Sequence, residues 1–488
     1  MSLKIYDTKA GQKVPFIPLA EGHVKMYVCG ITAYDYCHIG HARSALIFDM
    51  IVNYLRYCGY QVTYVRNFTD IDDKIINRAN EQGTTSEELA NRFIQEFYTD
   101  MNKLGVGTPD IEPKATEHLP EIIAIINELI GKGLAYQAGN DVYFAVDKFP
   151  QYGALSGRNL EDLQAGARIS VNEIKNNPMD FALWKGSKPG EPTWESPWGP
   201  GRPGWHIECS AMSRKYLGNT FDIHGGGEDL VFPHHENEVA QSEGASGEPF
   251  VKYWIHHAFV TIKNEKMSKS LHNFLTIRDV LQDNHPEALR LMVFATHYRH
   301  PLDFSDAALK DAQTGANRLY SCLADCDQLP TGNEGVQCQA KPAEIDFLTA
   351  LPQRFCEAMD NDFNTAQALG VLFDGSKTVN RIRQTLPKKP AKADIALLQK
   401  SARTIAELAG ILGLLHQEPA AFFAEQQARH LKSLSMTNES LQLLIQERLE
   451  ARAQKNWSRA DQIRDDLLTK QIELKDGPHG TTWKVASI

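Results

Sequence analysis

The spacing of apolar positions near the start of the chain changes from a short continuous run to a helical period and back. Residues 24–29 form a β-rich apolar run, residues 42–57 place apolar side chains three and four positions apart, and residues 61–68 form a second β-rich run. This order predicts the opening strand–loop–helix–strand unit of a parallel, doubly wound sheet. Because ligands of such sheets bind where strands end and helices begin, we expect chemistry in the loop of residues 30–37 and just after it.

The pattern then predicts two helices, an insertion and a return to strands. One helix begins after a capping box at residues 84–88, and a second covers residues 121–130. Residues 135–204 are rich in Gly, Pro and Trp, which indicates an insertion within the nucleotide-binding fold. Strand patterns return at residues 220–224 and 254–262.

Long amphipathic helices dominate the sequence after about residue 306. Two polar stretches, residues 329–342 and 417–438, have the composition of linkers. Between them, residues 343–415 predict a helical bundle, and residues 439–488 predict a small terminal module.

Composition narrows the classes of protein that fit this pattern. The 488 residues are 23% charged and 42% hydrophobic, which is typical of a globular chain with several domains. The net charge of −10 argues against non-specific coating of nucleic acid or of anionic lipid. Because no apolar run is long enough for a membrane span and the N-terminus has no leader pattern, we expect a cytoplasmic protein without a membrane partner, whose eight cysteines stay reduced.

One glycine motif lacks the sequence context of a dinucleotide-binding loop. Residues 199–204 match G-x-G-x-x-G, but the match follows no predicted strand, opens no predicted helix and carries two prolines, so we interpret it as a loop. The sequence contains no G-x-x-x-x-G-K-[ST] phosphate loop.

Two short motifs point to phosphate chemistry of another kind. His38-Ile39-Gly40-His41 places two imidazoles and a glycine at the start of the first long helix, where the helix N-terminus favours anions. Lys266-Met267-Ser268-Lys269-Ser270 places two ammonium groups on a polar loop after a predicted strand. Either motif alone has an ordinary explanation, as incidental histidines or a solvated basic turn. Together, on a parallel sheet, they resemble the paired signatures of class I aminoacyl-tRNA synthetases.

Longer stretches resemble one family in that class, the cysteinyl-tRNA synthetases of bacterial type. The resemblance is carried by residues 26–41, 204–210, 221–238 and 480–483, and it covers nearly the whole chain. It implies a Rossmann-like α/β catalytic domain with an insertion, followed by an α-helical bundle and a small C-terminal anticodon-binding domain. The implied divisions are 1–114 and 201–245 for the two halves of the core, 115–200 for the inserted segment, 246–310 for a stem-contact region with the Lys-Met-Ser-Lys-Ser loop, 311–418 for the bundle and 438–488 for the anticodon module.

A metal site is expected near the second half of the core. His234 and Glu238 are four positions apart in a segment with a helical pattern, so their side chains share a face. The zinc site of the family implies Cys29 and Cys209 as the other two ligands. The residue pattern by itself leaves Cys37, His235 and Glu236 as equal candidates, and it is also compatible with core cysteines and a surface His–Glu pair. Zinc would separate the thiol of cysteine from the hydroxyl of serine, because it binds thiolate in preference to a neutral hydroxyl.

The resemblance also implies the reaction and its residues. Cysteine would be activated with Mg-ATP to cysteinyl-adenylate and passed to the 3′ end of tRNA(Cys), with His38, His41, Lys266 and Lys269 as the catalytic residues. ATP would contact His38, Gly40, His41, Gly227, Asp229, His256 and Lys269. The substrate cysteine would contact Cys29, Thr69, Trp205, Cys209, His234 and Glu238.

The terminal module carries a basic pattern that suits an RNA partner. Arg448, Arg452, Lys455 and Arg459 are spaced as one stripe along a helix, which is also the spacing of an ordinary solvated face. By resemblance, Arg452, Trp457 and Asp461 would read the tRNA anticodon. This module argues against one rival, a ligase that passes cysteine to the amine of a small sugar. The intact His38, His41, Lys266 and Lys269 argue against a second rival, a non-catalytic RNA-binding relative. We expect a monomer.

Overall fold

The structure, a computed structural model, describes residues 3–158, 175–262, 265–266, 274–330, 335–477 and 480–486. It divides the chain into two compact units. The first unit comprises Met1–Ile277, Val293–Phe304 and Phe355–Ala368, and the second comprises Arg278–Met292, Ser305–Arg354 and Leu369–Ile488. Among the residues that the structure describes, no helix combines the length and the apolar character that crossing a membrane requires.

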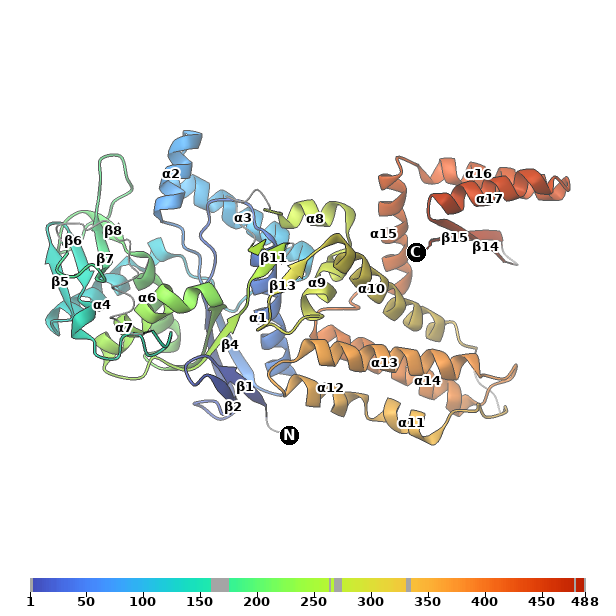
Figure 1. Ribbon diagram of the computed structural model, residues 1–488, viewed down its shortest axis with the longest axis horizontal. Coiled ribbons are helices and arrows are strands. Elements are labelled where there is room, and N and C mark those ends of the chain that lie inside the picture. The colour runs from blue at the N-terminus through green and yellow to red at the C-terminus, as the bar shows by residue number, and fades with distance from the viewer. Residues whose placement is uncertain are drawn as a thin grey trace. The chain divides into compact units, whose positions relative to one another are not determined.

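The elements up to residue 266, together with β13, belong to the first unit (Figure 1). The strands are β1 (Lys4–Asp7), β2 (Gln12–Pro15), β3 (His23–Val28), β4 (Gln61–Arg66), β5 (Ala135–Ala138), β6 (Asp141–Phe144), β7 (Phe181–Gly186), β8 (Gly201–Pro203), β9 (Phe221–Gly227), β10 (Val251–His257), β11 (Val260–Ile262), β12 (Glu265–Lys266) and β13 (Leu302–Phe304). The helices are α1 (Ile39–Tyr57), α2 (Asp73–Gln82), α3 (Ser86–Leu104), α4 (Leu119–Gly131), α6 (Trp205–Leu217) and α7 (Glu236–Ser246).

A four-stranded parallel sheet in the order β10-β9-β3-β4 forms the centre of the first unit. In its register, Met26 of β3 lies opposite Ile223 of β9 and Tyr64 of β4. The helix α1 packs closely on this sheet, since a Cβ atom on Gly225 would lie only 2.3 Å from the ring of Phe48. The predicted Rossmann-like parallel sheet is therefore confirmed.

The insertion forms an antiparallel sheet in the order β5-β6-β7-β8. Our interpretation of residues 199–204 as a loop is wrong for its second half, because Gly201–Pro203 form the strand β8. The glycines there serve packing: a Cβ atom on Gly201 would lie 2.3 Å from Trp184 Nε1, and one on Gly204 would lie 2.0 Å from the carbonyl oxygen of Ala182. The motif therefore has a structural explanation.

Two further expectations about single elements need correction. The strand pattern expected over residues 254–262 forms two strands that belong to different sheets. β10 pairs with β9, and β11 pairs with β13. The linker expected over residues 417–438 contains the helix α15 (Pro419–Ser433). This helix reads as a linker because it buries little, mainly Phe422 and Leu431, so that its exposed polar positions dominate the sequence.

The remaining part of the chain is mostly helical, as expected (Figure 1). The helices are α8 (Ile277–Asp283), α9 (Pro286–Phe294), α10 (Asp306–Asp327), α11 (Pro342–Thr349), α12 (Leu351–Met359), α13 (Thr365–Gln384), α14 (Lys392–Ile411), α15, α16 (Asn438–Ala453) and α17 (Trp457–Thr469). The chain closes with a hairpin of β14 (Ile472–Gly477) and β15 (Gly480–Val485), and α17 packs against β14.

Candidate active site and metal centre

A cavity of about 390 Å³ opens at the carboxyl ends of the central strands in the first unit. Its wall takes Cys29 from the end of β3, Gly227 from the end of β9 and His257 from the end of β10. Parallel strands bring their carboxyl ends to one edge of a sheet, which is why residues far apart in the sequence converge there. Further lining residues are His38, Gly40, His41, Trp205 and Asp229.

The two histidines at the start of α1 are held by backbone hydrogen bonds. The Gly40 N–H donates to His38 Nδ1 at 3.0 Å, and the His38 N–H donates to His41 Nδ1 at 3.3 Å. The two rings stack with centroids 3.7 Å apart. Because each Nδ1 accepts a hydrogen bond, each neutral ring carries its proton on Nε2 and can donate it. This arrangement caps the helix and at the same time supplies imidazole N–H donors beside the cavity.

Residues expected around ATP and cysteine occupy different depths of the site. Gly227 permits a close approach, since a Cβ atom there would lie 2.5 Å from Asp229 Oδ1. Trp205 is 40% exposed, so its indole is accessible from the cavity that it lines. Thr69 is buried and is not among the residues that line the cavity, and its hydroxyl donates to Glu208 Oε2 at 3.0 Å. No sequence pattern singled out Glu208.

The strand β10 presents two histidines in succession to two different environments. His256 contacts His235 through Nε2, at 2.7 Å from Nδ1, and Thr8 through Nδ1. His257 is the one that lines the cavity, and its Nδ1–H donates to the carbonyl oxygen of Ala258 at 3.1 Å. Burial lowers the pKa of His257 to about 4, so the ring is neutral at pH 7. Sequence reasoning missed His257 because neighbouring strand residues face opposite ways and nothing in the sequence fixed which one met the cavity.

The four expected metal ligands are brought together beside the cavity. Cys29, Cys209, His234 and Glu238 each offer one donor atom, and these atoms lie within 4.8 Å of one another. The two sulfur atoms are 3.7 Å apart, and His234 Nε2 lies 3.0 Å from Glu238 Oε1. All except Cys29 are fully buried, and Cys29 also borders the cavity. Two thiols, one imidazole and one carboxylate at this spacing fit a divalent metal.

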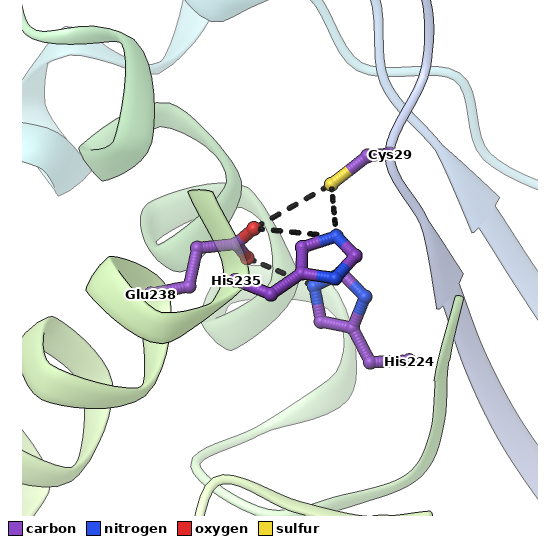
Figure 2. Close-up of side chains that lie close together, drawn as sticks. All are labelled: Cys29, His224, His235 and Glu238. Carbon is purple, nitrogen blue, oxygen red and sulfur yellow. Dashed lines mark hydrogen bonds and ion pairs between the residues drawn. The ribbon is translucent and has the colours of Figure 1, made fainter. Parts of the chain in front are cut away.

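A second, overlapping set uses the same cysteine and the same carboxylate. Figure 2 shows Cys29, His224, His235 and Glu238 converging on one point, and their donor atoms also lie within 4.8 Å of one another. His224 Nε2 lies 2.8 Å from Glu238 Oε2, and His235 Nε2 lies 3.3 Å from the sulfur of Cys29. The residue pattern indicated His235 as a candidate ligand, whereas it gave no sign of His224. The chain can therefore offer a metal either of two donor sets.

Charge in the cluster favours the ligating form of two groups. Burial alone would raise the pKa of the Glu238 carboxyl, but the charges and hydrogen bonds of His224 and His234 outweigh it and lower the pKa to about 2. The hydrogen bond from Cys29 lowers the pKa of the Cys209 thiol despite its burial. Deprotonated carboxylate and thiolate are the forms that bind a metal cation.

Cys37 and Glu236, the remaining candidate ligands from the residue pattern, lie outside both donor sets. Cys37 is buried as a small core residue. Glu236 is fully buried and accepts two backbone hydrogen bonds, from Gly153 N–H to Oε1 and from Ser156 N–H to Oε2, each 2.8 Å long. Its oxygens therefore hold a turn of the insertion against the start of α7.

We expect Glu236→Gln to lower the free energy of unfolding by about 1–3 kcal/mol, because the new amide NH₂ group must face a buried backbone N–H. Urea unfolding followed by tryptophan fluorescence measures the change. Glu87→Gln, on the exposed start of α3, is the control and should stay within about 0.5 kcal/mol of the parent chain. Metal content should not change in either variant, and a loss of metal from Glu236→Gln would contradict the scaffold role.

The second signature falls largely outside the described residues. Lys266 ends β12, which pairs with β11 at the register Thr261 to Lys266. Lys269 lies outside the described residues, so the roles of both lysines stay predictions from the sequence.

The basic stripe expected in the terminal module is wrong as a continuous helical feature. Asn456 caps α17 by accepting from the Arg459 N–H at 3.2 Å, and Lys455 between α16 and α17 has a positive φ of 58°. Arg459 then pairs with Glu447, with Nη2 2.6 Å from Oε1. The stripe is therefore divided between two helices.

The three residues expected at the anticodon have distinct surroundings. Trp457 is 58% exposed at the start of α17, and Asp461, one turn on, pairs with Arg464 at 3.2 Å. Arg452 pairs with Asp476 of β14, which also accepts two hydrogen bonds from Arg448 at 2.8 and 2.9 Å. The hydrogen bond from Arg448 contributes most to the lowered pKa of Asp476. Sequence reasoning missed Asp476 because no local spacing connects a hairpin residue with a preceding helix.

Comparison with known proteins agrees with this arrangement. Residues 15–314 match the family described as the tRNA synthetase class I (C) catalytic domain, and residues 354–416 match the DALR domain. A solved structure of methionyl-tRNA synthetase from Mycobacterium tuberculosis with methionyl-adenylate has a similar fold, with a TM-score of 0.61 at 16% identity over 81% of this chain and 91% of that one. The parallel sheet, the histidine pair at its edge and the family match together define a class I tRNA synthetase.

Two relatives narrow the assignment further. A cysteine–tRNA ligase of Desulfotalea psychrophila is 60% identical over 485 residues, 99% of each chain. One of Trichlorobacter lovleyi is 55% identical over 487 residues, 99% of this chain and all of the relative. The chain belongs to the cysteine–tRNA ligase family.

Proposed function

We propose that this protein joins cysteine to tRNA(Cys) in two steps that consume ATP. The cysteine carboxylate attacks the α-phosphorus of Mg-ATP, which forms cysteinyl-adenylate and releases pyrophosphate. A ribose hydroxyl at the 3′ end of the tRNA then attacks the cysteinyl carbonyl, loses its proton and releases AMP. The observation that carries the proposal is the position of Cys29, which borders the cavity of the histidine signature and belongs to the thiol-containing metal cluster.

In the first step, His38 and His41 act on the phosphates. Their Nε2–H groups donate hydrogen bonds to phosphate oxygens, where negative charge grows as the leaving pyrophosphate separates. Gly40 keeps the backbone at the helix start close to the phosphates, and Lys266 and Lys269 neutralise the pyrophosphate. Gly227, Asp229 and His256 belong to the proposed ATP site, and the cavity position of its neighbour His257 adds that residue as a candidate.

Selection of cysteine is assigned to the cluster of Cys29, Cys209, His234 and Glu238. The donor set of two thiols, an imidazole and a carboxylate suits Zn²⁺. A bound zinc ion supplies a soft Lewis acid that prefers a thiolate to a neutral hydroxyl, which an apolar pocket of the same size cannot do as well. Cys29 and Trp205, which line the cavity, contact the substrate side chain in this proposal, and Thr69, whose hydroxyl is bonded to Glu208, is the further residue assigned to the substrate cysteine.

The direct test is transfer of radiolabelled cysteine to unfractionated bacterial tRNA with Mg-ATP, in the presence and absence of excess unlabelled serine. We expect acid-precipitable label that serine does not dilute. Cysteine-dependent ATP–pyrophosphate exchange without label on tRNA would instead point to a small amine as the acceptor. Absence of both activities would favour a non-catalytic RNA-binding protein, and either of these results would overturn the proposal.

The terminal module is proposed to read the anticodon through Arg452, Trp457 and Asp461. We expect Trp457→Ala to raise the KM for tRNA roughly 10-fold or more, because stacking of a base on an aromatic ring is worth about 1–3 kcal/mol. Cysteine-dependent ATP–pyrophosphate exchange, which needs no tRNA, should keep its rate. Leu468→Ala, also exposed on α17, is the matched control. Equal losses of charging and exchange in Trp457→Ala would indicate a structural role.

A further inference from the structure

Arg43 is a fully buried residue of α1, two positions after His41, and it is not among the residues that line the cavity. Its guanidinium donates to three backbone carbonyl oxygens. Nη1 donates to the oxygen of Phe259 at 2.6 Å, and Nη2 donates to the oxygens of Tyr298, at 3.0 Å, and His300. Because the guanidinium is a planar fork with five N–H donors, one side chain can hold several carbonyl groups at fixed positions.

The three carbonyl groups belong to two chain segments that continue as parallel strands. The Ala258 N–H donates to the Tyr298 carbonyl oxygen at 2.9 Å. The Leu302 N–H donates to the Phe259 carbonyl oxygen at 3.0 Å. These bonds open the pairing of β11 with β13. Arg43 therefore binds where the two strands begin, and it attaches both of them to α1.

The segment held in this way forms part of the cavity and leads to the second signature. Residues 258–260, which we call the 258–260 wall, line the cavity. They follow His257, the residue that pairs in register with Gly227 of the proposed ATP site. The strand β12 pairs with β11 and ends at Lys266. Arg43 thus connects the helix of the signature histidines with a cavity wall and with the strand that contains Lys266.

The peptide group of Phe259 is held from a second direction by Glu228. The Phe259 N–H donates to Glu228 Oε1 at 3.1 Å. Glu228 stands between Gly227 and Asp229, which both belong to the proposed ATP site. Burial lowers the pKa of Arg43 to about 10 while the charge of Glu228 opposes this shift, so the guanidinium stays protonated at pH 7. One peptide group of the wall is therefore fixed from both sides, by a charged donor and by a carboxylate.

We propose that Arg43 is a positioning residue for adenylate formation, which fixes the 258–260 wall relative to His38 and His41. This inference rests on the proposed function, which supplies ATP as the ligand. Arg43 acts through the backbone of the wall and does not itself contact ATP. In-line attack on the α-phosphorus requires the reacting groups to be aligned, so a small shift of the wall against α1 slows the reaction. The metal cluster, whose residues come from other segments, keeps its geometry.

The test measures cysteine-dependent ATP–pyrophosphate exchange by Arg43→Lys in the full chain. Lysine keeps the positive charge but has no planar fork, so it cannot hold the same three carbonyl groups. We expect kcat/KM for ATP to fall roughly 10- to 100-fold, because a misplacement of about 1 Å in an active site can have that effect. Metal content and the dissociation constant for cysteine, which a general loss of structure would change, should equal the parental values.

Glu228→Ala is a second variant, at an exposed position, and it tests the same peptide group without a change in the core. We expect kcat/KM for ATP to fall roughly 3- to 10-fold, the effect of one lost hydrogen bond. Because Arg43 and Glu228 hold one peptide group, the double variant of Arg43→Lys and Glu228→Ala should lose less than the product of the two single effects. Independent, multiplicative losses would overturn the shared role.

Arg290→Lys is the matched control. Arg290 is also fully buried, and its Nη1 donates to the Leu412 carbonyl oxygen at 3.0 Å within the second unit. The substitution should lower the unfolding temperature about as Arg43→Lys does, and it should leave kcat/KM for ATP unchanged. Thermal unfolding of both variants, followed by tryptophan fluorescence, measures the structural cost.

Three further results would overturn the inference. The first is an equal fall in kcat/KM for ATP in Arg43→Lys and Arg290→Lys. The second is an equal fall in cysteine affinity and in kcat/KM for ATP in Arg43→Lys. The third is unfolding of Arg43→Lys at the assay temperature together with parental kinetics in Glu228→Ala. In each case a parent chain that exchanges pyrophosphate keeps the proposed function, whereas a parent without cysteine-dependent exchange would overturn that function itself.

Discussion

Replacing Cys209 by alanine is expected to remove the bound metal and to lower cysteine-dependent ATP–pyrophosphate exchange on the order of 10³-fold or more. Cys209 is buried and belongs only to the donor set with His234, so its loss leaves that set with three ligands. A metal that orients and polarises a substrate contributes several kcal/mol to the reaction barrier. Metal content by mass spectrometry and exchange kinetics measure the two losses independently.

The same measurement distinguishes the two overlapping donor sets. Cys58→Ala, which removes an exposed cysteine outside the cluster, is the control and should retain metal and activity. His235→Ala should retain metal if the set with Cys209 is the occupied one, although it removes the contact with Cys29. Metal retained by Cys209→Ala but lost by His235→Ala would transfer the assignment to the set drawn in Figure 2.

Replacing His41 by alanine is expected to lower the rate of adenylate formation about 10²- to 10³-fold, with little change in the dissociation constant for cysteine. The substitution removes one preorganised N–H donor from the phosphates, and removal of a single donor of this kind typically has an effect of that size. It also removes the acceptor for the His38 N–H, so part of the loss would come through His38. Rapid-quench measurement of cysteinyl-adenylate in the absence of tRNA isolates this step.

His23→Ala is the matched control for that experiment. His23 begins β3, at the opposite end of the strand from the cavity, and its Nε2 lies 2.9 Å from the hydroxyl of Thr63. Its removal should leave the rate unchanged. An equal fall in cysteine affinity and in rate for His41→Ala would show that the histidine holds the site together without acting on phosphate.

Local rules predicted the structure correctly where the interactions are local. The capping box at Thr85 and Glu88 forms as expected, with the Glu88 N–H donating to the Thr85 hydroxyl at 3.1 Å. The four-residue spacing of His234 and Glu238 likewise brings their side chains into contact. In both cases the two residues are three or four positions apart at the start of a helix, so short-range spacing is enough to predict the contact.

Long-range pairing lay beyond those rules. Cys29 and Cys209 are 180 positions apart, and only the family resemblance predicted that their sulfur atoms would lie close together. His224 sits in a strand whose facing side depends on the register with its neighbours, which a single sequence does not determine. The prediction of one basic stripe was wrong because Asn456 caps a second helix that begins at Trp457. The spacing of the charged residues gave no sign of this helix boundary.

The close packing of Phe48 on Gly225 makes the position of the signature histidines depend on a glycine outside the proposed metal and ATP sites. Phe48 belongs to α1, whose first turn carries both signature histidines, and the helix can lie that close to the sheet only because position 225 has no side chain. A substitution at Gly225 would shift the whole helix and would present in assays as a defect of the histidines. Transplanting the four-residue signature onto another parallel sheet would therefore require the matching glycine on the strand beneath it.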